Sequence, residues 1–237
     1  MRRKTRAIVA AVVILCLLLA AGWVVYTRTI KDYVDCARML SRVYNAEASD
    51  LSFDLNIDTS GNEVNSRFKA IRFPFQDTTA TQITVSLKTG DYTFYKIHGK
   101  NVEESGVNAE NQNAIPRNFM ELLEWGKGIY ESDLEIQTIR DRSRTTYRVT
   151  VPDDMVQSFL DAYLGALEPL DLKYSDCVLT LTGSKGNMTE LVLQGTADYR
   201  ILFVNASASI VVRARVNALG KDVTIPTVPD SVVKGAN

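Results

Sequence analysis

The feature that most constrains the fold is a strand that passes directly into an amphipathic helix, between residues 147 and 167. Residues 147–151 alternate apolar and polar side chains, as a strand with one buried face does. Pro152 cannot donate a hydrogen bond to a neighbouring strand, so it should end this one, and Asp153 is then a candidate N-cap. The apolar stripe of the helix consists of Met155, Val156, Phe159, Leu160, Tyr163, Leu164 and Leu167. Because β-patterned sequence lies on both sides, we expect this stripe to pack on the face of a sheet.

The rest of the chain predicts an α+β fold. Residues 51–59 are the clearest strand, with one apolar and one polar face, which is typical of an antiparallel sheet covered on one side. Further strands are expected at residues 67–73 (ended by Pro74), 81–88, 92–98, 134–140, 170–182, 189–197, 200–205, 207–218 and, at an edge, 222–228. Helices are expected at residues 30–48 and from about 116 to the glycines at 126 and 128, after a polar loop over 100–114. We therefore expect a strongly curved antiparallel sheet (an incomplete β-barrel) of about eight to ten strands, with helices against its concave face.

The N-terminus predicts a transmembrane helix. Residues 7–26 form an uncharged run of 20 residues, which as a helix spans about 30 Å, the thickness of a hydrocarbon core. Four bases precede the run and should stay in the cytoplasm. We therefore expect a single-pass signal-anchor in the cell membrane, with the C-terminal domain extracytoplasmic. A cleaved signal peptide is the alternative, because residues 20–22 are small, although the apolar run continues through Trp23 to Tyr26.

Charge divides the chain into a basic N-terminus and an acidic body. Residues 1–31 contain six bases and no acid, so the remaining residues hold 21 bases and 28 acids, a formal charge of −7. An acidic body argues against nucleic acid as a partner. The expected organisation is a cytoplasmic tip and anchor at 1–29, a linking amphipathic helix at 30–48, an ectodomain at 49–230 and a flexible tail at 231–237.

The chain has three cysteines. Cys16 lies in the predicted span and follows Leu15, which is too large for the small position before a lipidated cysteine. Cys36 and Cys177 would both lie outside the cytoplasm, where disulfides persist. They are a candidate disulfide, with free buried cysteines as the alternative.

The chain lacks the residue patterns of common catalytic and metal sites. His98 is the only histidine, which removes Cys/His nucleophile pairs and most zinc sites. No phosphate-binding loop, dinucleotide or metalloprotease motif occurs. Asp54, Asn56 and Asp58 share one strand face, and solvated side chains are a better interpretation of them than a cation site. We therefore expect a protein that is not an enzyme and that uses no cofactor.

The apolar helix faces are the remaining functional signal. If helices and sheet fit imperfectly they leave an apolar cavity, and a half-barrel that its own side chains do not fill can hold a ligand. The candidate ligand contacts are Phe53, Leu55, Phe119, Leu122, Leu123, Met155, Phe159 and Tyr163. The alternative is that these side chains close a core, in which case the ectodomain is an envelope interaction or scaffold module with a protein partner.

The order of elements resembles the LolA / LppX–LprG-like superfamily of bacterial envelope proteins. The resemblance covers roughly residues 35–230 and rests on the export segment, the Phe53–Ile57 strand, the hairpin that ends at 147–151 with the helix after it, and a closing Val-x-Ile-Pro at 223–226. It implies an incomplete β-barrel around apolar helices that carries or senses lipid, lipoprotein or glycolipid acyl chains. The absence of a lipidation cysteine favours a tethered protein over a shuttle.

Overall fold

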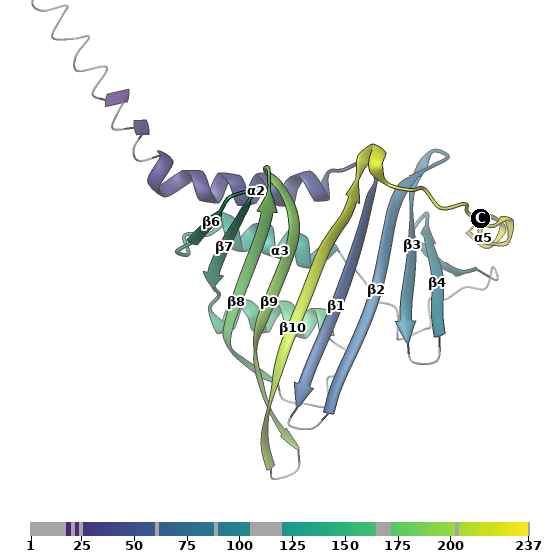
Figure 1. Cartoon of the computed structure of the whole chain (residues 1–237). Coiled ribbons are helices and arrows are strands. Elements are labelled where there is room, and N and C mark those ends of the chain that lie inside the picture. The colour runs from purple at the N-terminus through teal and green to yellow at the C-terminus, as the bar shows by residue number, and fades with distance from the viewer. Residues whose placement is uncertain are drawn as a thin grey trace, which may run out of the picture.

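One antiparallel sheet forms the body of the protein. The computed structural model describes residues 18–19, 22–23, 26–59, 62–87, 90–104, 120–164, 172–201 and 204–236. The strands in this part of the chain are β1 (Ser49–Thr59), β2 (Asn62–Phe75), β3 (Thr78–Leu87), β4 (Gly90–Ile97), β5 (Lys100–Glu103), β6 (Gln137–Asp141), β7 (Arg144–Thr150), β8 (Lys173–Ser184), β9 (Asn187–Ile201) and β10 (Val204–Leu219). They are hydrogen-bonded in the order β5-β4-β3-β2-β1-β10-β9-β8-β7-β6. This order is open at both ends, so the sheet curves without closing (Figure 1). The predicted α+β class and curved antiparallel sheet are confirmed.

The inner face of the sheet carries a continuous apolar row. Successive side chains of a strand point to opposite faces, and the register therefore decides which side chains meet across strands. Pairing brings together side chains from β7, β8, β9, β10, β1, β2 and β3, in that order: Tyr147, Leu181, Leu191, Ala214, Phe53, Phe68 and Val85. All seven are buried, and we call this set the apolar row.

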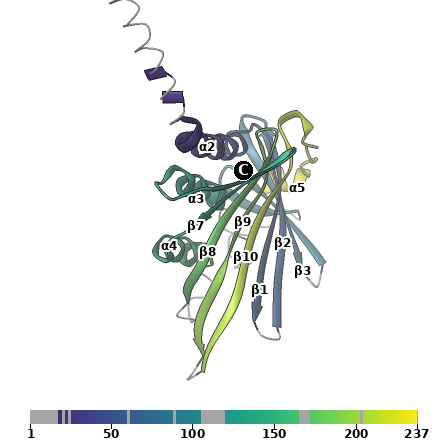
Figure 2. The same cartoon turned by 60° about the vertical axis from the view of Figure 1, so that its left-hand side comes forward.

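Three helices lie on the same side of the sheet, against its inner face (Figure 2). They are α2 (Lys31–Tyr44), which follows the π-helical turn η1 (Tyr26–Ile30), α3 (Met120–Glu131) and α4 (Asp153–Leu164). Their buried side chains join those of the apolar row in one hydrophobic cluster. Both Asp153 and Asp154 fall in the first turn of α4, where a negative charge interacts favourably with the helix dipole.

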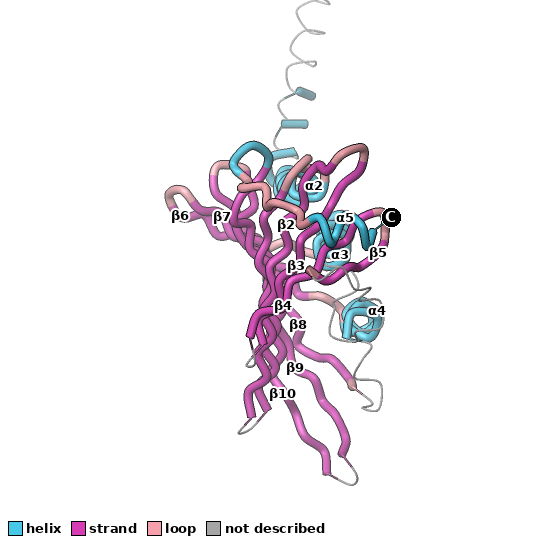
Figure 3. The backbone as a smooth tube through the Cα atoms, turned by 90° about the vertical axis from the view of Figure 1, so that its right-hand side faces the viewer, coloured by secondary structure: helices cyan, strands magenta, loops and turns pink. Residues whose placement is uncertain are grey.

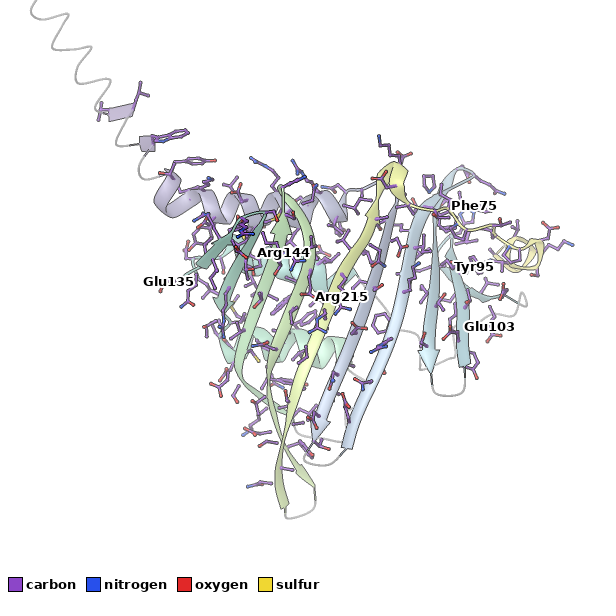
Figure 4. The ribbon with its side chains drawn as sticks, in the orientation of Figure 1. Phe75, Tyr95, Glu103, Glu135, Arg144 and Arg215 are labelled. Carbon is purple, nitrogen blue, oxygen red and sulfur yellow. The ribbon has the colours of Figure 1, made fainter. Side chains whose placement is uncertain are left out.

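The outer face is polar near the centre of the sheet. Arg215 on β10 donates hydrogen bonds to Asp54 on β1 at 3.1 Å and to Glu190 on β9 at 3.0 Å (Figure 4). Lys69 on β2 pairs with Asp50 at 3.0 Å. The residues of β1 thus have one dry and one wet face, as their alternation predicts.

A second, smaller core lies on the outer face at the β2–β5 edge. Phe73, Tyr95 and Val102 are buried there, and alternation along each strand places them opposite the side chains of the main cluster. They pack under α5 (Asp230–Ala236), which contributes Val232 and Ala236. Figure 3 shows α5 beside β5, at the C-terminal end of the chain. The residues predicted to form a flexible tail are therefore helical here up to Ala236.

Two predicted boundaries near the β2–β5 edge are wrong. Strand β2 continues through Pro74, which pairs with Thr79 of β3. The β1 ladder ends at the Ser49–Arg72 pair, so no β1 carbonyl requires a donor from Pro74. The first four residues of the predicted polar loop form β5, which pairs with β4.

Three further boundaries differ from the predictions. Helix α3 continues through both glycines expected to end it. Strand β9 is one strand instead of two, because Asp198 pairs with Lys173 on one side and Ser207 on the other. The predicted edge strand over 222–228 is wrong: the chain there forms the 3-10 turn η3 (Gly220–Asp222) and an extended segment outside the sheet, since Pro226 and Pro229 cannot donate to a ladder.

The predicted transmembrane helix, residues 7–26, falls mostly outside the described residues. Among the residues that are described, the structure contains no helix of the length and apolar character required to span a bilayer. The anchor therefore stays a prediction.

Candidate apolar-ligand site

Helices α3 and α4 contact each other over the inner face. Trp125 on α3 stacks on Phe159 on α4, with ring centroids 4.5 Å apart and planes 15° apart. Next to Trp125, a Cβ atom added at Gly126 would lie 3.0 Å from the Leu191 side chain. Glycine at this position therefore lets α3 approach β9 closely. These contacts hold the apolar stripes of both helices against the apolar row.

The structure brings most of the predicted ligand contacts into one cluster. Four of them are buried members of the main hydrophobic cluster: Phe53, Leu122, Leu123 and Phe159. Half-buried Leu55 packs against that cluster, whereas the side chain of Met155 is 36% exposed. Phe119 and the side chain of Tyr163 lie outside the described residues. Contact of any of these residues with a ligand stays a prediction.

The apolar inner face extends beyond the three helices. Phe53 stacks on Phe68, with centroids 5.4 Å apart, and Ile83, Val85 and Phe94 continue the cluster onto β3 and β4. In Figures 1 and 2, α2, α3 and α4 lie over the half of the sheet that contains β6–β10. The inner face of β2–β4 lies to the side of these helices, and its buried side chains are also apolar.

Polar side chains fix the two helices in place. The Tyr130 hydroxyl of α3 donates to the Tyr147 carbonyl at 2.9 Å and to the Leu179 carbonyl at 3.3 Å. Burial raises the pKa of Tyr130, so this hydroxyl stays protonated. The Gln157 side-chain amide of α4 donates one hydrogen bond to the backbone at the start of β8, at 2.9 Å, and accepts one from it, at 3.4 Å. Each helix is thus tied to a strand by a side chain that satisfies backbone groups.

Cys36 and Cys177 are free buried thiols in this structure. The candidate disulfide is therefore not formed, and the alternative of free buried cysteines describes them. Burial, together with the charges of Asp153 and Asp176, raises the pKa of Cys177 from 9.0 to about 11. Burial also raises the pKa of Cys36. Both thiols stay protonated at neutral pH, the form of cysteine that is unreactive.

Two of the three polar residues weighed as a cation site, Asp54 and Asn56, have protein partners on the outer face. Asp54 forms an ion pair with Arg67 at 3.6 Å and accepts a hydrogen bond from Arg215 at 3.1 Å, and Asn56 donates to Glu63 at 2.7 Å. His98 is exposed in the turn between β4 and β5. Within the ranges that the structure describes, no three His, Cys, Asp or Glu side chains are grouped as a metal site requires.

A polar pocket lies where α2 crosses the β8–β9 turn. The Arg42 guanidinium donates to the Gly186 carbonyl at 2.7 Å and to the Asn187 side-chain oxygen at 3.2 Å. Beside this crossing is a pocket of about 230 Å³, and its charged lining residues are Asp35, Arg38, Arg42 and Lys185. No sequence pattern predicted this pocket. The i, i+4 spacing of the two arginines places them on one helix face, but nothing local indicates that this face meets a turn about 144 residues later.

A scan against protein-family models and a search of curated proteins both find no match. Among solved structures, LprF from Mycobacterium bovis matches with 12% identity over 84% of this chain and 97% of that chain, at a TM-score of 0.38. The Mycobacterium tuberculosis lipoprotein LppX matches with 10% identity over 82% and 97%, at 0.37. A LolA superfamily protein from Nitrosomonas europaea matches with 9% identity over 81% and 96%, at 0.23. The LolA / LppX–LprG-like group expected from the sequence is thus represented among the solved structures that this chain matches, at identities of 9–12% and TM-scores of 0.23–0.38.

Proposed function

We propose that this chain is a membrane-tethered extracytoplasmic protein that binds a lipid or other apolar ligand against the inner face of its sheet, without catalysis. The observation that carries the proposal is the width of the apolar inner face. The apolar row spans seven strands, and the hydrophobic cluster around it includes Phe94 on β4, whereas the three helices lie over the β6–β10 half (Figure 2). The side chains of this wide apolar lining are buried, and such a lining suits an acyl chain held between the sheet and the helices.

The tether in this proposal is the predicted span at residues 7–26. It leads through η1 into α2, whose side chains Cys36, Met39, Leu40 and Val43 are buried in the main cluster. Because α2 is part of the folded core, the ligand-binding domain would be held directly beside the bilayer. This placement fits a protein that takes its ligand from the membrane.

The proposal can be tested with one tryptophan as reporter. Trp23 and Trp125 are the two tryptophans of the chain, so Trp23→Phe leaves only Trp125, which stacks on Phe159. We expect dibrominated stearate to quench Trp125 fluorescence saturably in the full-length protein held in nonionic detergent, because bromine quenches on contact. Unbrominated stearate is the matched control ligand and should not quench Trp125 fluorescence.

Two neighbouring positions on β3 provide the matched variants. Val85 is buried on the inner face and Thr84 points to the other face. Val85→Asp should abolish quenching, because a carboxylate in the apolar row would have to be buried beside the acyl chain, whereas Thr84→Asp should leave quenching intact. Circular dichroism checks that both variants fold. Equal quenching by both stearates would contradict the proposal.

A filled core with a protein partner is the second candidate function. The Trp125–Phe159 stack and the close approach of Gly126 to Leu191 favour it, because these side chains already satisfy one another. In that case brominated stearate does not quench, and Val85→Asp lowers only the thermal stability. Crosslinking of the full-length protein in its native membrane should then capture one specific envelope protein.

A further inference from the structure

The pocket beside α2 has the charge of an anion site. Three cations line it, Arg38 and Arg42 from α2 and Lys185 from the β8–β9 turn, against the single carboxylate of Asp35. Arg38 and Asp35 are 3.9 Å apart with their side chains 57% and 30% exposed, and an ion pair of this kind is weak in solvent. Lys185 forms no ion pair within the part of the chain that the structure describes. The pocket lining therefore keeps an excess of two positive charges.

The fold presets the positions of these cations. Arg42 is held by its hydrogen bonds to Gly186 and Asn187, and Gly186 adopts a φ of 76°, which glycine accepts without strain. A side chain at Gly183 would collide with Met39, so the glycine lets α2 sit directly on the hairpin. The hydroxyl-bearing residues Thr145 and Tyr147 of β7 complete the wall.

We propose that this pocket binds a phosphate group, either free phosphate or the phosphate of a lipid headgroup. Two guanidinium groups present planar forks of donors that match phosphate oxygens. The volume, about 230 Å³, is below the roughly 300–1,000 Å³ of sites for drug-sized ligands and suits a headgroup. Helix α2 starts directly after η1, next to the predicted membrane span, so the pocket would face the bilayer side. This inference goes beyond the proposed function, because it requires neither the acyl-chain site nor the tether.

The test titrates full-length, ¹⁵N-labelled protein in nonionic detergent and follows the backbone amide signals of Gly183 and Gly186. The probes are inorganic phosphate, short-chain phosphatidylglycerol and short-chain phosphatidylcholine. We expect saturable shifts of both glycine signals with phosphate, phosphatidylglycerol or both, and weaker binding at higher salt. The double variant Arg38→Gln/Lys185→Gln, which keeps the Arg42 contacts to the hairpin, should bind about tenfold more weakly.

Lys234→Gln is the matched control. It removes one positive charge from an exposed residue on α5, which lies far from α2 and the β8–β9 turn in Figure 1, and should leave both titrations unchanged. Binding of inorganic phosphate alone identifies free phosphate as the ligand, and binding of phosphatidylglycerol without inorganic phosphate identifies the lipid. The inference is overturned if neither inorganic phosphate nor phosphatidylglycerol shifts the two glycine signals. It is also overturned if phosphatidylcholine shifts them as phosphatidylglycerol does and the double variant binds as tightly as the native chain. Acyl-chain quenching at Trp125 is measured separately, so either site can fail alone.

Discussion

Gly195 on β9 lies against Cys177, where β8 forms a bulge between Ser175 and Val178. A Cβ atom there would collide with the Cys177 side chain and lie 3.2 Å from its Cα. We expect Gly195→Ala to lower the free energy of unfolding by about 2 kcal/mol, because the overpacked site has backbone on one side. Gly128→Ala on α3 meets nothing within 4 Å and should raise it by about 0.5–1 kcal/mol through helix propensity. Urea denaturation of both variants measures this, and equal effects would contradict the packing at Gly195.

The two buried thiols give a second prediction at the residue scale. In a Cys16→Ser background, a thiol reagent at pH 8 should label neither cysteine of the folded chain and both after denaturation without reductant. A disulfide would instead leave no reactive thiol in the denatured chain.

The burial of Cys177 also makes the stability of the fold depend on pH. The folded-state pKa of Cys177 is about 11, above its usual value of 9.0, so the unfolded chain loses this proton first. The contribution to stability is complete below pH 9.0 and is lost as the pH rises towards 11. Denaturation midpoints should therefore fall over this range, and Cys177→Ala should reduce that slope.

At the scale of elements, carbonyls at the end of α2 accept hydrogen bonds from a side chain of the sheet. Arg72 of β2 donates to the carbonyls of Val43, Tyr44 and Ala46, which lie in and just after the last turn of α2, where the helix supplies no i+4 donor. The Val43 carbonyl also accepts from the Ala46 N–H at 3.4 Å. Burial lowers the pKa of Arg72, but a guanidinium stays charged at physiological pH. A long-range side chain thus adds to the local backbone hydrogen bonds at the end of the helix.

Arg72→Met should therefore lower the free energy of unfolding by about 1–3 kcal/mol, since it leaves partly buried carbonyls without a donor. Arg67→Met changes the same residue type on the same strand, where the side chain is 77% exposed beside Asp54, and should change stability by less than about 0.5 kcal/mol. Thermal denaturation of the full-length chain compares the two. Similar losses would show that the α2 carbonyls do not depend on Arg72.

At the scale of the whole molecule, the sheet has a core on each face. The outer core depends on α5, whose Val232 is fully buried against the β2–β5 edge. Val232→Asp should detach α5 and raise amide hydrogen exchange at Tyr95 and Val102, because a buried carboxylate without a partner is costly. Val233→Asp, on a half-buried neighbour, should have a much smaller effect. If exchange rises equally at Leu179, in the main cluster, the two cores are not independent.

Much of the fold and part of the site could be predicted from local patterns. Alternation located β1, β3, β4, β6, β7 and β8, and the 3.6-residue period located α2 and α4. The buried positions of Phe53 and Phe159 followed from those two periods. The predictions failed where a distant partner outweighed a local signal. At Gly126 the helix continues and packs closely on Leu191, and at Pro74 the β1 ladder has already ended.

The sequence by itself determined most of the secondary structure, the dry and wet faces of the central strands, and the absence of common catalytic motifs, because each depends on the spacing of residues near one another in the chain. Only the tertiary structure decided what meets across long separations. The apolar row depends on strand register, the outer core on where α5 docks, and the phosphate-sized pocket on α2 crossing the β8–β9 turn. The strand that passes into α4 illustrates both parts: its sequence defined a helix with an apolar stripe, and packing against Trp125 decided what Phe159 touches.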